Sequence, residues 1–167
     1  MTQAHAAKAA PEPRGPAEQQ RLEAALRTLM ERQITFNQTL GLVVESFDPD
    51  AARVRFEMRD ELVGHFLYGR LHGGVIAATL DTTGGFAIML ALARAHPADT
   101  PEQVMLRFGR LGTIDLRTDF LRPGIGRAFV AQARVTRLGG RIASTQMTLE
   151  NDHGKLIATA SAAYVVS

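Results

Sequence analysis

The order of hydrophobic and polar residues predicts helices and a pair of strands in the N-terminal part of the chain. In residues 16–32, leucines recur at helical spacing among charged residues, which predicts an amphipathic helix. Residues 36–41 indicate one more helical turn that ends at a glycine. Residues 42–47 and 52–58 predict two strands, because apolar and charged residues alternate along the second segment, as in a half-buried antiparallel strand.

A long apolar segment, residues 72–93, follows a predicted loop at residues 59–71. Its length would allow a membrane span, but Asp81 lies in its middle, and a charge at the centre of a bilayer is costly. We therefore expect no membrane span and a buried helix of a globular protein instead. Because the segment is apolar almost all round, other elements must surround it on most sides.

The C-terminal part of the chain predicts four consecutive strands joined by short turns. These strands cover residues 113–121, 128–138, 141–150 and 155–166. Two strands, one long helix and four strands form an α+β pattern, in which a curved antiparallel sheet wrapped around the central helix would bury it. We expect one domain over residues 17–167 and a disordered tail over residues 1–16, which is rich in alanine and proline.

The composition restricts the ligands, nucleophiles and cofactors to be expected for this chain. The formal net charge is +2, and this mild basic bias suits an anionic small molecule but is too weak to indicate nucleic acid binding. The absence of cysteine excludes a disulfide framework and a thiolate nucleophile, and it fits a reducing, cytoplasmic environment. The sequence contains no metal-binding cluster, phosphate loop, dinucleotide motif or nucleophilic serine motif, so we expect no metal and no redox cofactor.

Asp81 is the first candidate for chemistry, because it interrupts an otherwise aliphatic helix. A buried carboxylate without a partner is costly, and protein cores rarely contain one. A carboxylate in a dry pocket can act as a general base or as a nucleophile. The structural alternative is that Asp81 bonds a backbone amide or caps a helix break at Gly84-Gly85.

The start of the long helix, His72-Gly73-Gly74, is the second candidate. Free amides at a helix N-terminus carry partial positive charge, and glycine lets a substrate approach the backbone closely. Such amides can stabilise the oxyanion that forms when a carbonyl group is attacked. The alternatives are a plain tight turn for the glycines and, for His72, a role in orienting the loop instead of a role in catalysis.

The spacing of these two candidates has a geometric consequence. Asp81 follows His72 by nine residues, or two and a half helical turns, so the two side chains face opposite sides of the helix about 13 Å apart along its axis. One chain cannot easily bring both to a single substrate atom. A two-fold dimer can, because it places Asp81 of one subunit beside the helix start of the other. The sequence therefore predicts a homodimer.

Leu71-His72-Gly73-Gly74 opens the long helix, Asp81 follows inside it, and a strand from Thr113 leads to Leu121-Arg122-Pro123-Gly124. In these motifs, over residues 36–166, the chain resembles the hotdog-fold acyl-CoA thioesterases of the phenylacetyl-CoA type. The resemblance implies hydrolysis of acyl-CoA thioesters to free acid and CoA, with no cofactor beyond the CoA of the substrate. It also implies sites shared between the subunits of a homodimer, or of a homotetramer built as a dimer of dimers.

The resemblance assigns roles to further residues. Gly73 corresponds to the residue whose amide binds the oxyanion, and the adjacent Gly74 would contact the substrate. Thr113 corresponds to a serine or threonine that hydrogen-bonds near the attacking water. The alternative for Thr113 is an ordinary strand residue. Family members of the best-known type carry an asparagine six residues before the histidine, where this chain has Phe66 next to His65. A wall formed by Phe66 would favour medium-chain aliphatic acyl groups over aromatic ones; plain loop packing is the alternative.

Three arginines are candidates for binding the CoA phosphates, because the guanidinium group suits phosphate. They are Arg122, Arg137 and Arg141. The alternative is that these side chains are simply solvated at the surface.

Two other function classes stay open. A hotdog hydratase or dehydratase would act on the substrate carbons with a histidine and a carboxylate, and the helix start here is closer to the thioesterase pattern. A non-catalytic acyl-CoA-binding protein on the same fold would need an effector module. Residues 1–35 are too few and too rich in alanine and proline for such a module.

Overall fold

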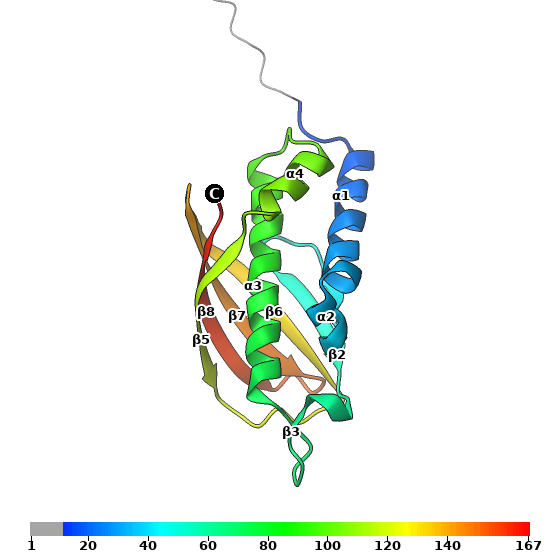
Figure 1. Ribbon diagram of the computed structural model, residues 1–167, viewed down its shortest axis with the longest axis vertical. Coiled ribbons are helices and arrows are strands. Elements are labelled where there is room, and N and C mark those ends of the chain that lie inside the picture. Colours follow the sequence, from blue (N-terminus) through cyan, green and yellow to red (C-terminus); the bar gives the residue numbers. More distant parts are fainter. Residues whose placement is uncertain (1–11) are drawn as a thin grey trace, which may run out of the picture.

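The fold of the computed structural model is a six-stranded antiparallel sheet that curves around one long helix, α3 (Gly73–Ala95) (Figure 1). The structure describes residues 12–167, so the first eleven residues of the predicted tail lie outside the described part. The strand order is β1-β2-β6-β7-β8-β5, with β1 and β5 at the two edges. The predicted α+β fold, with a curved sheet around a central helix, is confirmed.

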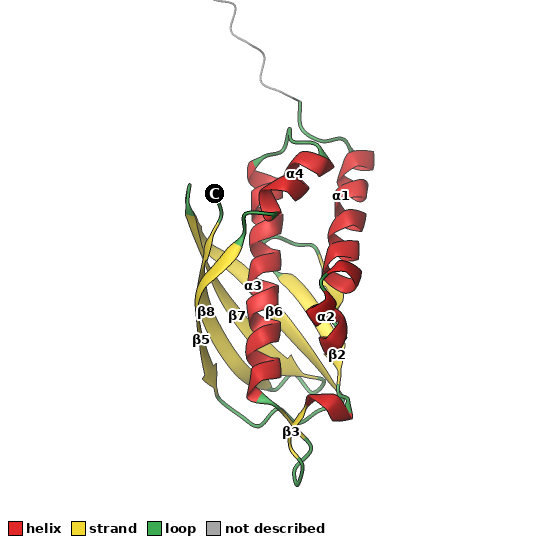
Figure 2. Cartoon of the chain, viewed as in Figure 1, coloured by secondary structure: helices red, strands yellow, loops and turns green. Residues whose placement is uncertain are grey.

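All six strands of this sheet occur where the alternation of apolar and polar residues predicts them. They are β1 (Val43–Ser46), β2 (Ala52–Glu57), β5 (Gly112–Phe120), β6 (Ala128–Leu138), β7 (Ile142–Asn151) and β8 (Leu156–Val165). Their alternating burial reflects a sheet with one face on the core and the other outside, as Figure 2 shows. The edge strand β5 is the exception, because most of its residues are exposed.

Helix α3 is apolar on nearly all sides because it lies between the sheet and a layer of shorter helices. It packs against β2, β5, β6, β7 and β8 on the sheet side, and against α2 (Thr35–Leu40) and α4 (Pro101–Phe108) on the other. By length and composition α3 is the one described helix that could cross a membrane, but most of its apolar stretch is buried inside the fold. The expectation that this segment is a core helix therefore agrees with the structure.

The N-terminal helix differs from its prediction. The expected helix over residues 16–32 is α1 (Pro16–Thr28) followed by a π-helical turn, η1 (Leu29–Gln33), and α2 then ends at Gly41, whose φ is 71°. The fully buried Asn37 of α2 donates a hydrogen bond from Nδ2 to the Met30 carbonyl inside the π turn, at 2.9 Å. A side chain of the following helix, seven residues along the chain, thus stabilises an irregular turn that the helical pattern alone does not predict.

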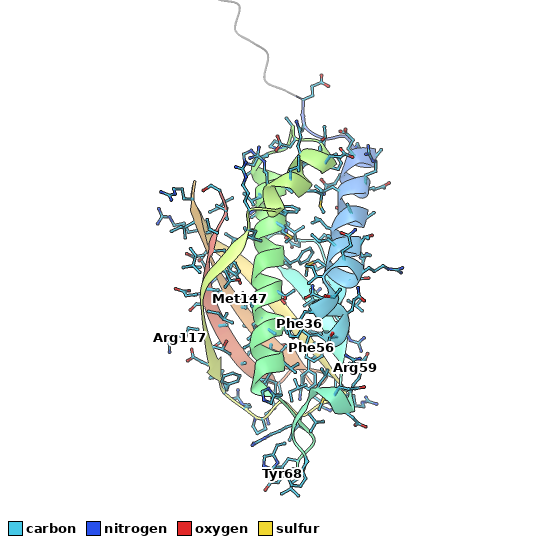
Figure 3. The ribbon with its side chains drawn as sticks, viewed as in Figure 1. Phe36, Phe56, Arg59, Tyr68, Arg117 and Met147 are labelled. Atoms are coloured by element: carbon cyan, nitrogen blue, oxygen red, sulfur yellow. The ribbon has the colours of Figure 1, made fainter. Side chains whose placement is uncertain are left out.

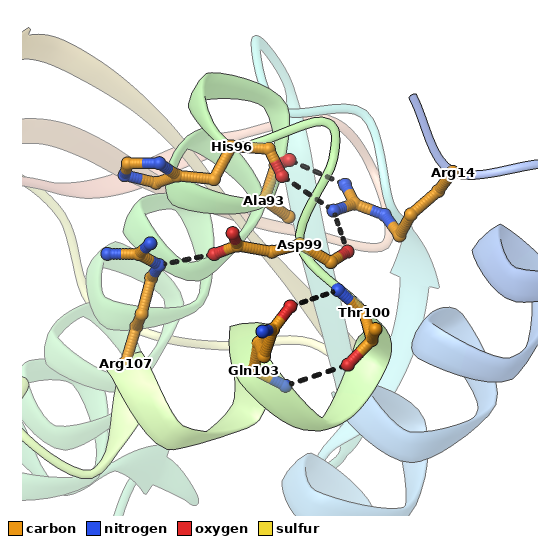
Figure 4. A network of polar contacts seen from close by, with 7 residues as sticks. All are labelled: Arg14, Ala93, His96, Asp99, Thr100, Gln103 and Arg107. Carbon is orange, nitrogen blue, oxygen red and sulfur yellow. Dashed lines mark hydrogen bonds and ion pairs between the residues drawn. The ribbon is translucent and has the colours of Figure 1, made fainter. Parts of the chain in front are cut away.

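Helix α4 has no counterpart among the predicted elements. Thr100 and Gln103 form a capping box at its start: Thr100 Oγ1 accepts from the Gln103 amide at 3.3 Å, and Gln103 Oε1 accepts from the Thr100 amide at 2.8 Å (Figure 4). The guanidinium of Arg107 binds Asp99 at 2.6 Å and holds the pKa of that carboxyl below its ordinary value. These contacts fix the connection between α3 and β5.

Arg14 lies in the described part of the predicted tail and anchors it to the end of α3. Its guanidinium donates to the carbonyls of Ala93, His96 and Asp99 at 2.5, 2.7 and 2.8 Å (Figure 4). Carbonyls at a helix C-terminus lack partners within the helix, so this arginine satisfies groups that would otherwise need water. The last residues of the predicted tail are therefore attached to the domain, and Pro16 already begins α1.

The predicted loop at residues 59–71 contains regular structure. A 3-10 turn, η2 (Asp60–Leu62), leads into a small hairpin of β3 (Val63–His65) and β4 (Arg70–Leu71), which projects beyond the end of the main sheet (Figures 1 and 3). Its tip carries three consecutive exposed hydrophobic side chains: Phe66, Leu67 and Tyr68.

Candidate active site

Asp81 lies on the side of α3 that faces β5 and β8. Its Oδ1 accepts a hydrogen bond from Thr113 Oγ1 of β5 at 2.9 Å and another from Tyr164 Oη of β8 at 3.1 Å. The same phenol lies 2.9 Å from the backbone carbonyl of Asp81. Within residues 12–167 no group donates to Oδ2 of this carboxylate, so one oxygen is held from two strands and the other is left for a substrate or a water molecule.

The structural alternative for Asp81 does not hold in the described chain. Helix α3 runs without a break through Gly84 and Gly85, so there is no helix end there to cap. Both partners of the carboxylate are side-chain hydroxyls, and no described backbone amide bonds to it.

Tyr164 is the member of this cluster that the sequence analysis missed. It is 2% exposed, and burial, followed by the nearby charge of Asp81 and the hydrogen bond to it, raises the pKa of the phenol well above its ordinary value. The phenol therefore stays protonated and acts as a hydrogen-bond donor. In the sequence Tyr164 is indistinguishable from the other inward-facing residues of a strand, and only the pairing of Thr113 with Tyr164 between β5 and β8 brings it to the site.

At the start of α3, the two candidate amides have different partners. Gly74 N donates to Nδ1 of His72 at 2.9 Å, so the imidazole serves as the N-cap of the helix. For Gly73 N the described residues offer no acceptor, which leaves this amide available to a ligand. A Cβ added to Gly73 would lie 3.4 Å from the ring of Phe120, which is an ordinary van der Waals contact. The Phe120 ring therefore lies beside this glycine without overlapping a small side chain.

The helix start opens into a surface hollow of about 420 Å³, whose lining includes His65, His72, Gly73, Phe120 and Arg122. Asp81 and Thr113 are not part of this lining. Asp81 follows Gly73 by eight positions of the helix, which is about 12 Å along the axis. A single chain thus carries the carboxylate and the free amide in two separate places, as the spacing predicts.

The two candidate residues of the hairpin differ in exposure, because His65 has a buried ring nitrogen and Phe66 is exposed. The ring of His65 lies between those of Phe66 and Tyr68, with centroid distances of 5.8 and 4.8 Å, and its Nδ1 is buried without a hydrogen-bond partner in the described chain. Phe66 is 85% exposed at the tip of the hairpin and does not line the hollow. Within one subunit Phe66 therefore forms no wall of an acyl pocket.

The three candidate arginines are not gathered into one phosphate site within a chain. Arg122 lines the hollow at the first turn of α3, and its guanidinium donates to the Leu156 carbonyl at 2.9 Å. Arg137 lies at the opposite end of the helix, beside Arg94, and the exposed Arg141 follows the turn after β6 at the same end. A helix of 23 residues is about 34 Å long, so no single phosphate group can meet all three in one chain. No three His, Asp or Glu side chains of the described residues are grouped to hold a metal ion.

The N-cap geometry predicts a measurable effect on stability. His72→Ala should lower the free energy of unfolding by about 1 kcal/mol, the usual cost of losing an N-cap acceptor, whereas His72→Asn should retain most of it because its side-chain oxygen can accept from Gly74 N. Urea denaturation measures both values. His153→Ala is the matched control, since this imidazole is exposed on the β7–β8 turn. Equal stability of the alanine and wild-type proteins would contradict the capping role.

Known proteins match most of this chain. A family model described as the thioesterase superfamily matches residues 68–158. The medium/long-chain acyl-CoA thioesterase YigI of Escherichia coli (strain K12) is 36% identical over 131 residues, which cover 78% of this chain and 84% of that protein.

Solved structures extend the match to nearly the whole fold. A crystal structure of a Shewanella oneidensis protein related to the thioesterase superfamily superposes with a TM-score of 0.84 at 34% identity, covering 92% of this chain and 100% of that one. A crystal structure of a Syntrophus aciditrophicus protein gives a TM-score of 0.80 at 34% identity, covering 90% of this chain and 99% of that one.

Proposed function

The chain belongs to the thioesterase superfamily, and we propose that it hydrolyses acyl-CoA thioesters with Asp81 as the catalytic carboxylate and the Gly73 amide as the oxyanion donor. The activity class, expected from the sequence, is confirmed by the identity to an acyl-CoA thioesterase over most of the chain. This identity also favours hydrolysis over the hydratase and the non-catalytic binding protein. The residue roles rest on one observation: Oδ1 of Asp81 is held by two hydroxyls, while no residue of the described chain donates to Oδ2.

In the proposed reaction, Oδ2 of Asp81 accepts a proton from water while the water oxygen attacks the thioester carbonyl carbon. The carbonyl electron pair moves onto oxygen, and this oxyanion accepts a hydrogen bond from Gly73 N. When the carbonyl re-forms, the carbon–sulfur bond breaks, and CoA leaves as a thiol with the proton that Asp81 returns.

In the alternative route, a carboxylate oxygen of Asp81 attacks the thioester carbonyl carbon, and the carbon–sulfur bond breaks with release of CoA as a thiolate. Water then hydrolyses the mixed anhydride to the free acid and the Asp81 carboxylate, and it supplies the proton that the CoA thiolate takes up.

We further propose that each site combines Asp81 of one subunit with Gly73 of its partner. The separation of these groups within one chain supports this arrangement, because a two-fold axis can bring them together. The edge strand β5, which holds Asp81 through Thr113, exposes three hydrophobic residues on itself or at its end: Ile114, Phe120 and Leu121. Exposed apolar edge strands pair with other chains, and a second copy of this chain is the partner we propose.

The further expectations from the sequence remain proposals. A tetramer, as a dimer of such dimers, would use other surfaces than β5. A cytoplasmic location is consistent with a chain that contains no cysteine. We propose aliphatic acyl groups of medium to long chain as substrates, because YigI bears that description.

A panel of acyl-CoA substrates tests the function and the substrate class together. We expect release of free CoA, detected with a thiol reagent, and faster turnover of hexanoyl-CoA and octanoyl-CoA than of phenylacetyl-CoA and hydroxybenzoyl-CoA. Binding of acyl-CoA without release of thiol on any member of the panel would refute hydrolysis. Faster turnover of the aromatic substrates would overturn only the proposed chain preference.

A further inference from the structure

We propose that Tyr164 is a positioning residue of the catalytic carboxylate: its hydroxyl, reaching α3 across a gap left by Gly84, fixes Oδ1 of Asp81 and so presents Oδ2 to the substrate. This inference rests on the proposed catalytic role of Asp81 and adds a residue to it. Tyr164 touches neither the substrate nor the reacting atoms, since it acts only through Asp81.

The space for this contact is built into the helix. A Cβ on Gly84 would overlap the Tyr164 hydroxyl, and it would also lie 3.1 Å from Thr145 Oγ1 and 3.2 Å from Met147 Sδ. Only glycine at this position lets the phenol of β8 pass over α3 to the residue one turn earlier, Asp81. The next residue, Gly85, is different, because a Cβ there would meet Leu111 at 3.7 Å and Tyr164 at 4.0 Å, which are ordinary contacts.

The directions of the hydrogen bonds give the contact its chemical effect. Thr113 donates to Oδ1 of Asp81, and Tyr164 shares its one hydroxyl hydrogen between the same oxygen at 3.1 Å and the Asp81 backbone carbonyl at 2.9 Å, so the carboxylate is held in one rotamer from two strands. A charged, immobile carboxylate is what a general base or a nucleophile needs. The phenol remains a donor because burial and the charge of Asp81 oppose its ionisation.

Few charged groups lie around this carboxylate in the described chain. From β5, Asp115 also acts on the phenol, and its own carboxylate accepts from the Ala163 amide at 3.0 Å. Thr82, the residue after Asp81, donates from Oγ1 to Oδ1 of Asn37 in α2 at 3.3 Å. No described cation bonds to Asp81, so its side-chain partners in the described chain are the two hydroxyls.

Tyr164→Phe removes the hydroxyl and keeps the ring. We expect kcat to fall about 10- to 100-fold, the factor that corresponds to a hydrogen bond to a charged group, with KM for octanoyl-CoA nearly unchanged. A purely structural link between the phenol and the Asp81 carbonyl would lower thermal stability without a loss of kcat at unchanged KM.

A pair of glycine substitutions tests the same idea with the hydroxyl in place. Gly84→Ala should displace the phenol from Asp81 and reproduce the kcat loss of Tyr164→Phe at nearly unchanged KM. Gly85→Ala, the matched control one residue away, should keep wild-type kcat and KM, since its methyl group makes only ordinary contacts. Equal behaviour of the two alanine variants would overturn the proposed role of the gap.

A measurement that does not depend on activity separates this inference from the proposed function. Crystal structures of the wild-type and Tyr164→Phe proteins show the rotamer of the Asp81 side chain directly. A displaced or disordered Asp81 carboxylate in the variant supports the positioning role even if no substrate of the panel is hydrolysed. If the carboxylate keeps its place and the two proteins share the same kcat while Asp81→Asn is inactive, the inference about Tyr164 is wrong and the role of Asp81 stands.

Discussion

Replacing Asp81 by asparagine should lower kcat for octanoyl-CoA by at least ~100-fold, the usual scale for losing acid–base help, while the fold stays intact. The amide has the shape of the carboxylate and can still accept hydrogen bonds at its oxygen from Thr113 and Tyr164. It lacks the basic, nucleophilic oxygen that either chemical route needs. Steady-state release of CoA measures the effect, and circular dichroism checks the fold.

The matched control is Asp50→Asn, an equally conservative change at a carboxylate remote from the site. Asp50 lies in the turn after β1, and the guanidinium of Arg94, which bonds it at 2.8 and 3.0 Å, lowers its pKa from the ordinary value. Because this pair is exposed, we expect wild-type kcat. If Asp81→Asn retained activity comparable to Asp50→Asn, the carboxylate would have a structural role only.

The choice between the two routes for Asp81 requires a different observation. A single turnover in oxygen-18 water incorporates label into the Asp81 side chain only if an anhydride forms and water attacks its aspartyl carbon. Direct attack of water on the thioester leaves the Asp81 peptide unlabelled and places the label in the product acid. Mass analysis of both molecules distinguishes labelled enzyme from labelled acid. Label in the enzyme establishes the anhydride, whereas label in the acid alone results from direct attack or from attack on the acyl carbon of an anhydride.

The main elements of the fold could be predicted because each has a strong local pattern. Six strands and the long helix follow from the alternation of apolar residues and from one apolar run. Helix α4 also has a local signal, because Thr100-Pro101-Glu102-Gln103 is a capping box with proline at the first helical position, so this helix could be predicted from the sequence. The π turn η1 could not be predicted, because its partner Asn37 is polar and nothing in the sequence indicates that Asn37 is buried.

The candidate site was predictable only where a residue breaks its local pattern. Asp81 and the glycines of the helix start do so. In the described chain hydroxyls hold the carboxylate, and no residue accepts a hydrogen bond from the Gly73 amide. Tyr164 conforms to the alternation of β8, so its contact with Asp81 depends on strand pairing and on the gap at Gly84, both long-range features. The three arginines do not lie together within one chain, because sequence proximity to a motif says nothing about which end of α3 a strand reaches, and their role toward the CoA phosphates stays a prediction.

Mixing two inactive variants should restore activity if the sites are shared between subunits. One variant is Asp81→Ala. The other is Gly73→Pro, which removes the proposed donor amide at a position where proline fits, because Gly73 is the first residue of α3 and the residue before it has extended backbone with ψ 138°. Each homodimer should be nearly inactive. With random exchange, half of the chains enter heterodimers in which one of two sites is intact, so about a quarter of wild-type activity should return.

The control for the proline variant is Gly73→Ala, which keeps the amide hydrogen and adds a methyl group 3.4 Å from Phe120. We expect this variant to retain much more activity than Gly73→Pro, which separates loss of the donor from crowding of the hollow. Sizing and circular dichroism of each variant, and native mass spectrometry of the mixture, establish that folded heterodimers form. If they form and no activity returns, each site takes its carboxylate and its amide from the same chain. The 12 Å separation along α3 would then have to be bridged by a movement within one subunit, because the helix itself holds the two groups apart.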